Sequence, residues 1–270
     1  MLGTSASNQT GAALGALAFP VLGPIGVVGV RQFVSAVALV PTVRPRVRGL
    51  RPIQWGPVVA LALVFGLMNL SLYLAIDRIG LAAAVTLEFL GPLAVAILGS
   101  RSRIDLAAAA LAGVGVLALT QPGPTTDLLG IALGLTAAAC WAAYIVLNRT
   151  IGRQLPGVEG VALASLISAA LWLPIGLVWL RLHPPTPAAL ALAGACGLLA
   201  SVAPYVGDLL ALRRVSAAMY GTFTAVNPLW AALAGWLVLA QPLAVLEWLG
   251  VVLIVVSSVL VTAAGSGRHP

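Results

Sequence analysis

Residues 66–96 read GLMNLSLYLAIDRIGLAAAVTLEFLGPLAVA. Two apolar runs flank a short charged turn at Asp77 and Arg78, and the second run contains one acidic residue, Glu88. Together with the residues that precede or follow it, each run reaches the ~20 mainly apolar residues that a helix needs to cross a bilayer. This stretch therefore predicts two successive membrane-spanning helices joined by a tight turn.

The rest of the chain has the same character. It has 270 residues, of which 61% are hydrophobic and 8% are charged, and its mean hydropathy is +1.08. Soluble proteins are roughly 25% charged, and a globule of this length has too little interior to bury so much apolar surface. We expect an all-α integral membrane protein with no separate soluble domain.

Apolar runs and their breakers predict ten transmembrane helices. The predicted spans are 2–19, 24–43, 55–76, 80–99, 104–121, 128–148, 158–181, 187–212, 215–238 and 242–264. Such spans account for about 200 residues at ~20 residues each. The remaining residues suffice only for short loops and two short ends.

Arginines, which supply all fourteen basic residues, alternate between rich and poor connections. Eleven lie in every second loop and the C-terminal tail: Arg44, Arg46, Arg48, Arg51, Arg101, Arg103, Arg149, Arg153, Arg213, Arg214 and Arg268. Arg78 and Arg181 lie on the opposite side. The positive-inside rule predicts that the rich side and both termini are cytoplasmic, in a bacterial-type plasma (inner) membrane. The net charge of +7 is spread over short runs rather than one basic face, so no nucleic-acid partner is expected.

An internal repeat relates the two halves of the chain. Arg78, Thr86 and Pro92 recur 136 residues later as Arg214, Thr222 and Pro228. Residues 1–121 would hold spans 1–5, and residues 128–264 would hold spans 6–10. Because five spans is an odd number, the second copy enters the membrane inverted relative to the first. Inverted five-helix repeats are typical of secondary transporters with a binding site near the bilayer midplane.

Five polar side chains from five predicted spans share one depth. At 1.5 Å per residue, each lies about 10–15 Å from the edge of its span. They are Gln9, Arg31, Asn69, Glu88 and Asn227. Burial of such groups in a bilayer is costly, and it often marks a site for substrate or protons. We expect Glu88 to bind the ammonium of a zwitterionic substrate or to take a coupling proton, and Arg31 to meet a carboxylate.

Two structural alternatives stay open for these groups. Arg31 and Glu88 would neutralise each other in an ion pair, and the amides would join helices through hydrogen bonds. Aromatic residues in predicted spans 3, 6 and 8 are candidates to wall a substrate path or to pack as anchors. These aromatic candidates are Tyr73, Trp141, Tyr144 and Tyr205.

The stretch 66–96, the segment Ala139-Cys-Trp141-Ala-Ala-Tyr144 and the pair Pro204-Tyr205 resemble the drug/metabolite transporter superfamily. They are most similar to its EamA-type branch of threonine/homoserine exporters, and the likeness spans residues 7–262. The resemblance implies a ten-helix carrier that moves small amino acids or related metabolites outward, with proton coupling. It also implies that the first helix is short at its cytoplasmic end, or that the true start lies before Met1. Asn227 stands where a relative would have an acid, so proton coupling would depend on Glu88.

Other functions remain to be weighed. A carrier of amphiphilic cations or nucleotide-sugar-like solutes is the main alternative. An enzyme is not expected, because His183 and His269 lie in a loop and the tail, and no hydrolase or metalloprotease motif is present. No metal or cofactor is expected. The partners are then the lipid bilayer, a small-molecule substrate and, in a homodimer, a second copy of the chain.

Overall fold

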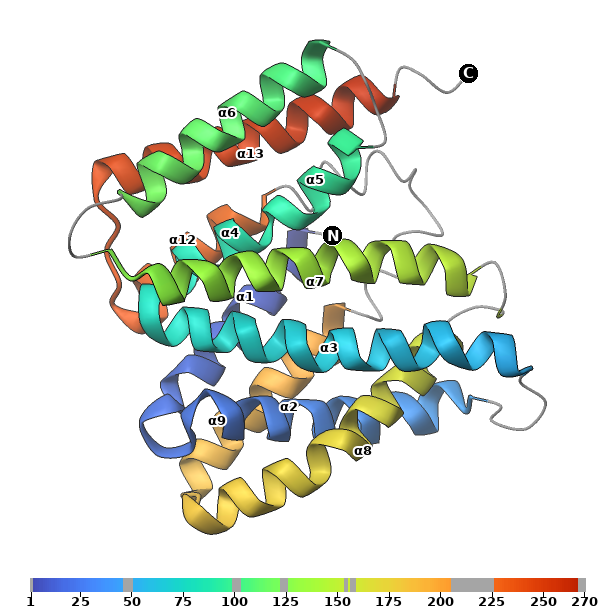
Figure 1. Cartoon of the computed structure of the whole chain (residues 1–270). Coiled ribbons are helices and arrows are strands. Elements are labelled where there is room, and N and C mark those ends of the chain that lie inside the picture. Colours follow the sequence, from blue (N-terminus) through green and yellow to red (C-terminus); the bar gives the residue numbers. More distant parts are fainter. Residues whose placement is uncertain are drawn as a thin grey trace.

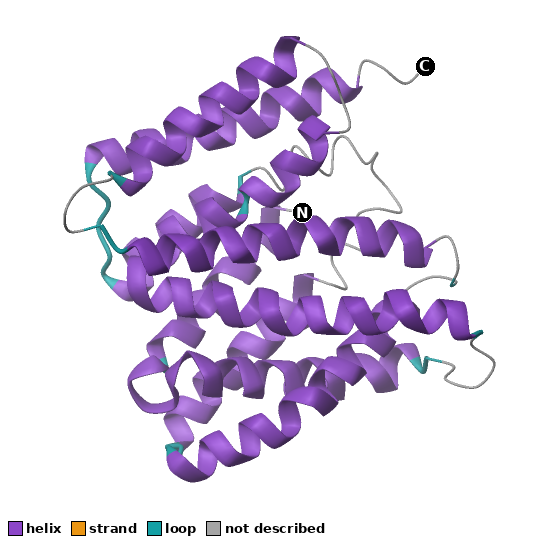
Figure 2. Cartoon of the chain, viewed as in Figure 1, coloured by secondary structure: helices purple, strands orange, loops and turns teal. Residues whose placement is uncertain are grey.

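The structure is a computed structural model that describes residues 2–45, 51–98, 103–121, 126–152, 155, 159–204 and 226–266. Over these residues the chain folds into helices joined by short loops and contains no strand (Figure 2). Four helices are long and apolar enough to cross a membrane, and shorter apolar helices accompany them. The prediction of an all-α, multi-pass membrane protein is therefore confirmed.

Each of the ten predicted spans contains a described helix. The elements are α1 (Leu2–Leu17), α2 (Phe19–Val43), α3 (Pro52–Ile79), α4 (Leu81–Glu88), α5 (Leu90–Leu98), α6 (Arg103–Thr120), α7 (Leu128–Gly152), α8 (Glu159–Leu182), α9 (Pro187–Gly197), the π-helical segment η1 (Leu198–Val202), α12 (Asn227–Leu239) and α13 (Val245–Ser266). The predicted span 80–99 is divided between α4 and α5, and α9 continues into η1. α1 has 16 residues, in line with the expected short first helix.

α3 and α7 run side by side, and α1 and α9 are inclined to them (Figure 1). α3 packs along α7 and α8, and α2 packs along α8 and α9. α6 and α13 pack on each other as a pair at one edge of the molecule (Figure 1). We call the end at which α3 turns into α4 the arginine-poor end, and the end at which α2 finishes and α3 begins the arginine-rich end.

Glycine and proline explain where the helices bend. Gly23 has φ of +62° inside α2, ahead of Pro24, a conformation that glycine adopts without a steric penalty. Gly80 has φ of +80° and forms the tight turn between α3 and α4. Pro92 has no backbone N–H, so the carbonyl of Glu88 loses its helical partner. This loss places a break in the predicted fourth span directly after Glu88.

The main hydrophobic core lies toward the arginine-poor end. It includes Leu22, Tyr73, Leu81 and the small residues Ala13 and Ala231. Polar contacts fasten the same end: the indole Nε1 of Trp179 donates to the carbonyl of Leu22 at 2.6 Å, and the backbone N–H of Leu81 donates to Gln241 Oε1 at 3.1 Å. A cavity lies between the helices on the other side of this core.

Candidate functional site

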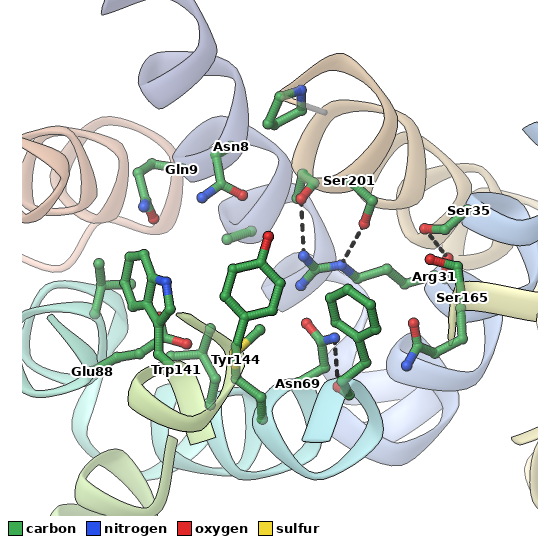
Figure 3. A pocket seen from close by; sticks show the side chains of 18 of the residues that line it. Asn8, Gln9, Arg31, Ser35, Asn69, Glu88, Trp141, Tyr144, Ser165 and Ser201 are labelled. Atoms are coloured by element: carbon green, nitrogen blue, oxygen red, sulfur yellow. Dashed lines mark hydrogen bonds between the residues drawn. The ribbon is translucent and has the colours of Figure 1, made fainter. Parts of the chain in front are cut away.

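A cavity of about 330 Å³ lies among α1, α2, α3, α4, α7, α8 and η1. We call it the central cavity (Figure 3). Its deepest residues lie near the middle of the helices, and Leu39, which lines it, is one turn from the end of α2 at Val43. The central cavity therefore extends from mid-bundle toward the arginine-rich end.

Six of the nine residues predicted from sequence line the central cavity. They are Gln9, Arg31, Asn69, Glu88, Trp141 and Tyr144. They come from five helices, and the depth estimated from helical rise placed the four polar members at one level. The structure also brings them onto one internal surface.

Two of the other three predicted residues, Tyr73 and Asn227, are not in the described lining. Tyr73 is fully buried behind Arg31. Asn227 begins α12 and is buried, and its Oδ1 has no hydrogen-bond partner among the residues that the structure describes. Tyr205 lies outside the described residues. Tyr73 and Asn227 therefore do not line the central cavity directly.

Arg31 is held by three hydrogen bonds. Its Nε donates to Ser201 Oγ at 3.0 Å, its Nη2 to the carbonyl of Ala200 at 2.9 Å, and its Nη1 to Tyr73 Oη at 3.2 Å. Ser201 and Ala200 belong to η1, where the wider π-helical winding frees carbonyls from regular α-helical bonding. The guanidinium is thus fixed in one orientation at the cavity wall (Figure 3).

Glu88 lines the central cavity at the end of α4, beside the break caused by Pro92. Its carboxylate has no hydrogen bond to any residue in the part of the chain that the structure describes. Glu88 and Arg31 lie on opposite sides of the cavity in Figure 3 and form no ion pair. The ion pair found over the described ranges is Arg78–Asp127. The alternative in which Arg31 and Glu88 neutralise each other by direct contact is therefore wrong.

Asn69 is oriented by its own helix. Its Nδ2 donates to the carbonyl of Phe65 at 2.8 Å, so the amide oxygen faces the cavity (Figure 3). Two aromatic contacts support the neighbouring wall. Trp141 meets the Phe89 ring edge-on at 5.5 Å between centroids, and Tyr144 lies 5.5 Å from Phe65. The cavity thus combines apolar ring surfaces with a few oriented polar groups, as small-molecule sites usually do.

Sequence reasoning missed five polar residues of the lining: Asn8, Gln32, Ser35, Ser165 and Ser201. Asn8 and Gln32 directly follow or precede residues that were predicted, and this adjacency was a usable signal. Gln32 Nε2 donates to Ser168 Oγ at 2.8 Å and so ties α2 to α8. The serines had no distinguishing pattern, because single serines are common in membrane helices.

The described residues contain no group of three or more His, Cys, Asp or Glu side chains that could hold a metal ion. Cys140 and Cys196 are both free and buried. Among the described residues, the polar groups that line the central cavity are one carboxylate, one guanidinium, amides and hydroxyls. Such a set can bind a small polar molecule by charge and hydrogen bonding.

Comparison with known proteins gives relatives that cover most of the chain. The threonine/homoserine exporter RhtA of Salmonella typhimurium strain LT2 is 35% identical over 256 residues, which are 93% of this chain and 86% of the relative. RhtA of Escherichia coli K12 is 34% identical over 262 residues, or 96% of this chain and 88% of the relative. The uncharacterized transporter YwfM of Bacillus subtilis is 28% identical over 159 residues, or 57% of this chain and 52% of the relative.

A crystal structure of another protein shares the fold, with a TM-score of 0.64 at 18% identity, over 99% of each chain. The model of the EamA-like transporter family matches residues 128–263. A membrane-spanning helical bundle with a polar internal cavity is what a carrier of small molecules requires. The chain belongs to the EamA-like transporter family and is a multi-pass membrane transporter.

Proposed function

We propose that this transporter exports small zwitterionic amino acids, with threonine and homoserine as the first candidates. One observation carries the proposal: a carboxylate and a guanidinium line the same cavity without pairing with each other. An amino acid has the two opposite charges that would match them. The similarity to RhtA, whose name states threonine/homoserine export, supports the same cargo.

In this scheme Glu88 binds the substrate ammonium, and Arg31 binds the carboxylate. Charge-assisted hydrogen bonds of this kind are about twice as strong as neutral ones. The Asn69 amide oxygen would accept a hydrogen bond from a side-chain hydroxyl, and Gln9 would complete the polar surface from α1. Trp141 and Tyr144 would exclude water from the apolar part of the substrate.

Transport would follow alternating access between two halves. The repeat in the sequence and the presence of helices in all ten predicted ranges support two inverted five-helix units, 1–121 and 128–264. The distribution of arginines supports a bacterial-type inner-membrane location with both termini in the cytoplasm. Proton coupling would depend on Glu88, because it is the only carboxylate in the described lining of the central cavity. A homodimer is compatible with this scheme but is not needed for it.

A carrier of amphiphilic cations is the second candidate. Such a carrier would require an anionic cavity without a neighbouring base. Arg31 lies in the same cavity as Glu88 and would repel a cation that lacks a carboxylate. The geometry therefore favours a zwitterion over a cation.

Threonine counterflow in proteoliposomes tests this proposal. It needs no imposed proton gradient and so separates recognition from coupling. The protein should exchange radiolabelled threonine, and Glu88→Gln should lose the exchange or its pH dependence. Glu247→Gln is the matched control, because Glu247 is also acidic but lies outside the described linings of both cavities. Absence of threonine and homoserine exchange in the unmodified protein would refute the proposed cargo.

A further inference from the structure

A second cavity of about 310 Å³ lies at the arginine-poor end of the bundle. We call it the vestibule. It is formed where the end of α1, the start of α2 and the ends of α3 and α12 meet, and it includes Phe19, Ile76, Asp77 and Gln241. The vestibule lies on the side of the core opposite to the central cavity. The proposed function assigns no role to the vestibule.

The two cavities are separated by a single helical turn. On α1, Ala12 lines the central cavity and Ala16 lines the vestibule. On α3, Leu72 lines the central cavity and Ile76 lines the vestibule. Four residues of an α-helix span about 6 Å. A small displacement of the side chains in this one layer would therefore join the cavities into a continuous path.

Two aromatic rings occupy the layer between the cavities. Tyr73, which is completely buried, meets the ring of Phe19 edge-on at 5.8 Å between centroids. Phe19 belongs to the vestibule lining. On its other side, Tyr73 Oη accepts the hydrogen bond from Arg31 Nη1 at 3.2 Å, and Arg31 belongs to the central cavity. Tyr73 thus contacts one residue of each cavity lining, Arg31 of the central cavity and Phe19 of the vestibule.

We propose that Tyr73 is the gate between the central cavity and the vestibule, and that the substrate carboxylate opens it by replacing the Tyr73 hydroxyl on Arg31. The gate rests on the proposed function in one respect, that the substrate has a carboxylate that binds Arg31. It does not depend on which amino acid is carried. It explains why Tyr73 lies outside the substrate cavity and yet contacts its only described cation.

The competition has a clear chemical basis. A guanidinium binds a carboxylate through two parallel charge-assisted hydrogen bonds, whereas it gives a phenol oxygen one weaker bond. A carboxylate in the cavity is therefore a better partner for Arg31 than Tyr73 is. The other polar partner of Tyr73 Oη is Cys196 Sγ at 2.9 Å, and sulfur is a weak hydrogen-bonding group. Without Arg31, the ring would be held mainly by packing against Phe19.

Thiol labelling of the barrier layer tests the gate. The reporter is Ala13→Cys, because Ala13 lies in the same layer on α1 and is completely buried. Cys140 is replaced by alanine and Cys196 by serine, which keeps a hydrogen-bonding partner for Tyr73 Oη, and threonine counterflow is measured first in that background. A membrane-impermeant methanethiosulfonate is then added to both faces of proteoliposomes, with and without threonine. Ala108→Cys on α6 is the matched control, because Ala108 is equally buried and α6 contributes no residue to the described lining of either cavity.

Threonine should accelerate labelling of the Ala13→Cys reporter but not of the Ala108→Cys control. Tyr73→Phe keeps the ring and removes the hydroxyl, so labelling of the reporter should be roughly tenfold faster without threonine, as expected for the loss of one hydrogen bond to a charged donor. An unchanged labelling rate in Tyr73→Phe would overturn the gate.

If Tyr73→Phe also exposes the Ala108→Cys control, the variant is misfolded, and Phe19→Leu then decides the question. Phe19→Leu removes the ring contact and should likewise accelerate labelling of the reporter, whereas an unchanged rate would overturn the gate. If threonine is not exchanged in counterflow, the proposed cargo is wrong, but the comparison of Tyr73→Phe without ligand still decides whether Tyr73 closes the path.

Discussion

Replacing Arg31 with lysine separates the role of charge from the role of geometry. The substitution keeps one positive charge at the cavity wall. Arginine reaches three acceptors, at 3.0 Å (Ser201 Oγ), 2.9 Å (Ala200 carbonyl) and 3.2 Å (Tyr73 Oη). A lysine ammonium is a single point donor and cannot reproduce this planar fork. We expect Arg31→Lys to lose the two bonds to η1, which orient the guanidinium for a substrate carboxylate, and to keep a bond to Tyr73 Oη, with which that carboxylate competes.

The magnitude follows from the two lost bonds. A hydrogen bond to a charged group contributes about 1.5–3 kcal/mol. Part of this energy is regained when the ammonium reorients, so a total of about 3 kcal/mol is expected for the two bonds. At about 1.4 kcal/mol per factor of ten, threonine counterflow should fall roughly 100-fold at substrate concentrations below half-saturation.

Two controls make the result interpretable. Ser201→Ala removes only the hydrogen bond from Arg31 Nε, so threonine counterflow should fall about tenfold, as expected for the loss of a single bond. Thermal unfolding of the purified protein, followed by tryptophan fluorescence, reports whether Arg31→Lys remains folded. If folded Arg31→Lys retains counterflow within about threefold of the unmodified protein, the fixed guanidinium geometry is not used for recognition, and the reasoning fails.

Three further predictions concern stability and pH. Gly91→Ala would place a methyl group against the α7 backbone and should lower the free energy of unfolding by about 1–3 kcal/mol, measurable by thermal unfolding; an unchanged midpoint would contradict this close approach. Trp179→Phe removes the hydrogen bond to the Leu22 carbonyl and should lower the free energy of unfolding by about 1 kcal/mol in the same assay. Trp179→His keeps a ring N–H that can donate to this carbonyl and should lower the free energy of unfolding by less. Asp127 has its pKa lowered by the backbone N–H of Gly130 and by Arg78, so its stabilising effect is present above its ordinary pKa and is lost only as the pH falls through the lowered value. Asp127→Asn should therefore not change the pH profile of counterflow between pH 5 and 7, because this window lies above the usual Asp pKa of about 3.9. A shifted profile would show that Asp127 titrates in this window.

Much of the candidate site could be predicted because depth in a membrane helix follows from the number of residues. Counting at 1.5 Å per residue placed Gln9, Arg31, Asn69 and Glu88 at one level, and all four line the central cavity. The break after Glu88 could also be anticipated, because Pro92 cannot donate the hydrogen bond that Glu88 would need.

Rotation about the helix axis was not predictable from the same residues. Asn227 has a suitable depth but is buried outside the described lining of the central cavity. Tyr73 was also a candidate from the sequence, but the structure places it in the barrier layer, where it bonds to Arg31 from behind. Ser165 and Ser201 gave no signal in the sequence because their significance depends on which helices face them.

The amino-acid sequence by itself determined the solvent, the helices, the depth of each polar group and the transporter family. Apolar length, arginine placement and proline chemistry are local properties, and local properties suffice for these conclusions. Only the tertiary structure decided which side chains share the central cavity, that Arg31 and Glu88 stay apart, and that Tyr73 stands between two cavities. A helix that is apolar all round carries no amphipathic stripe to indicate its inner face, since lipid and protein interior are equally apolar. The packing of neighbouring helices must supply that information.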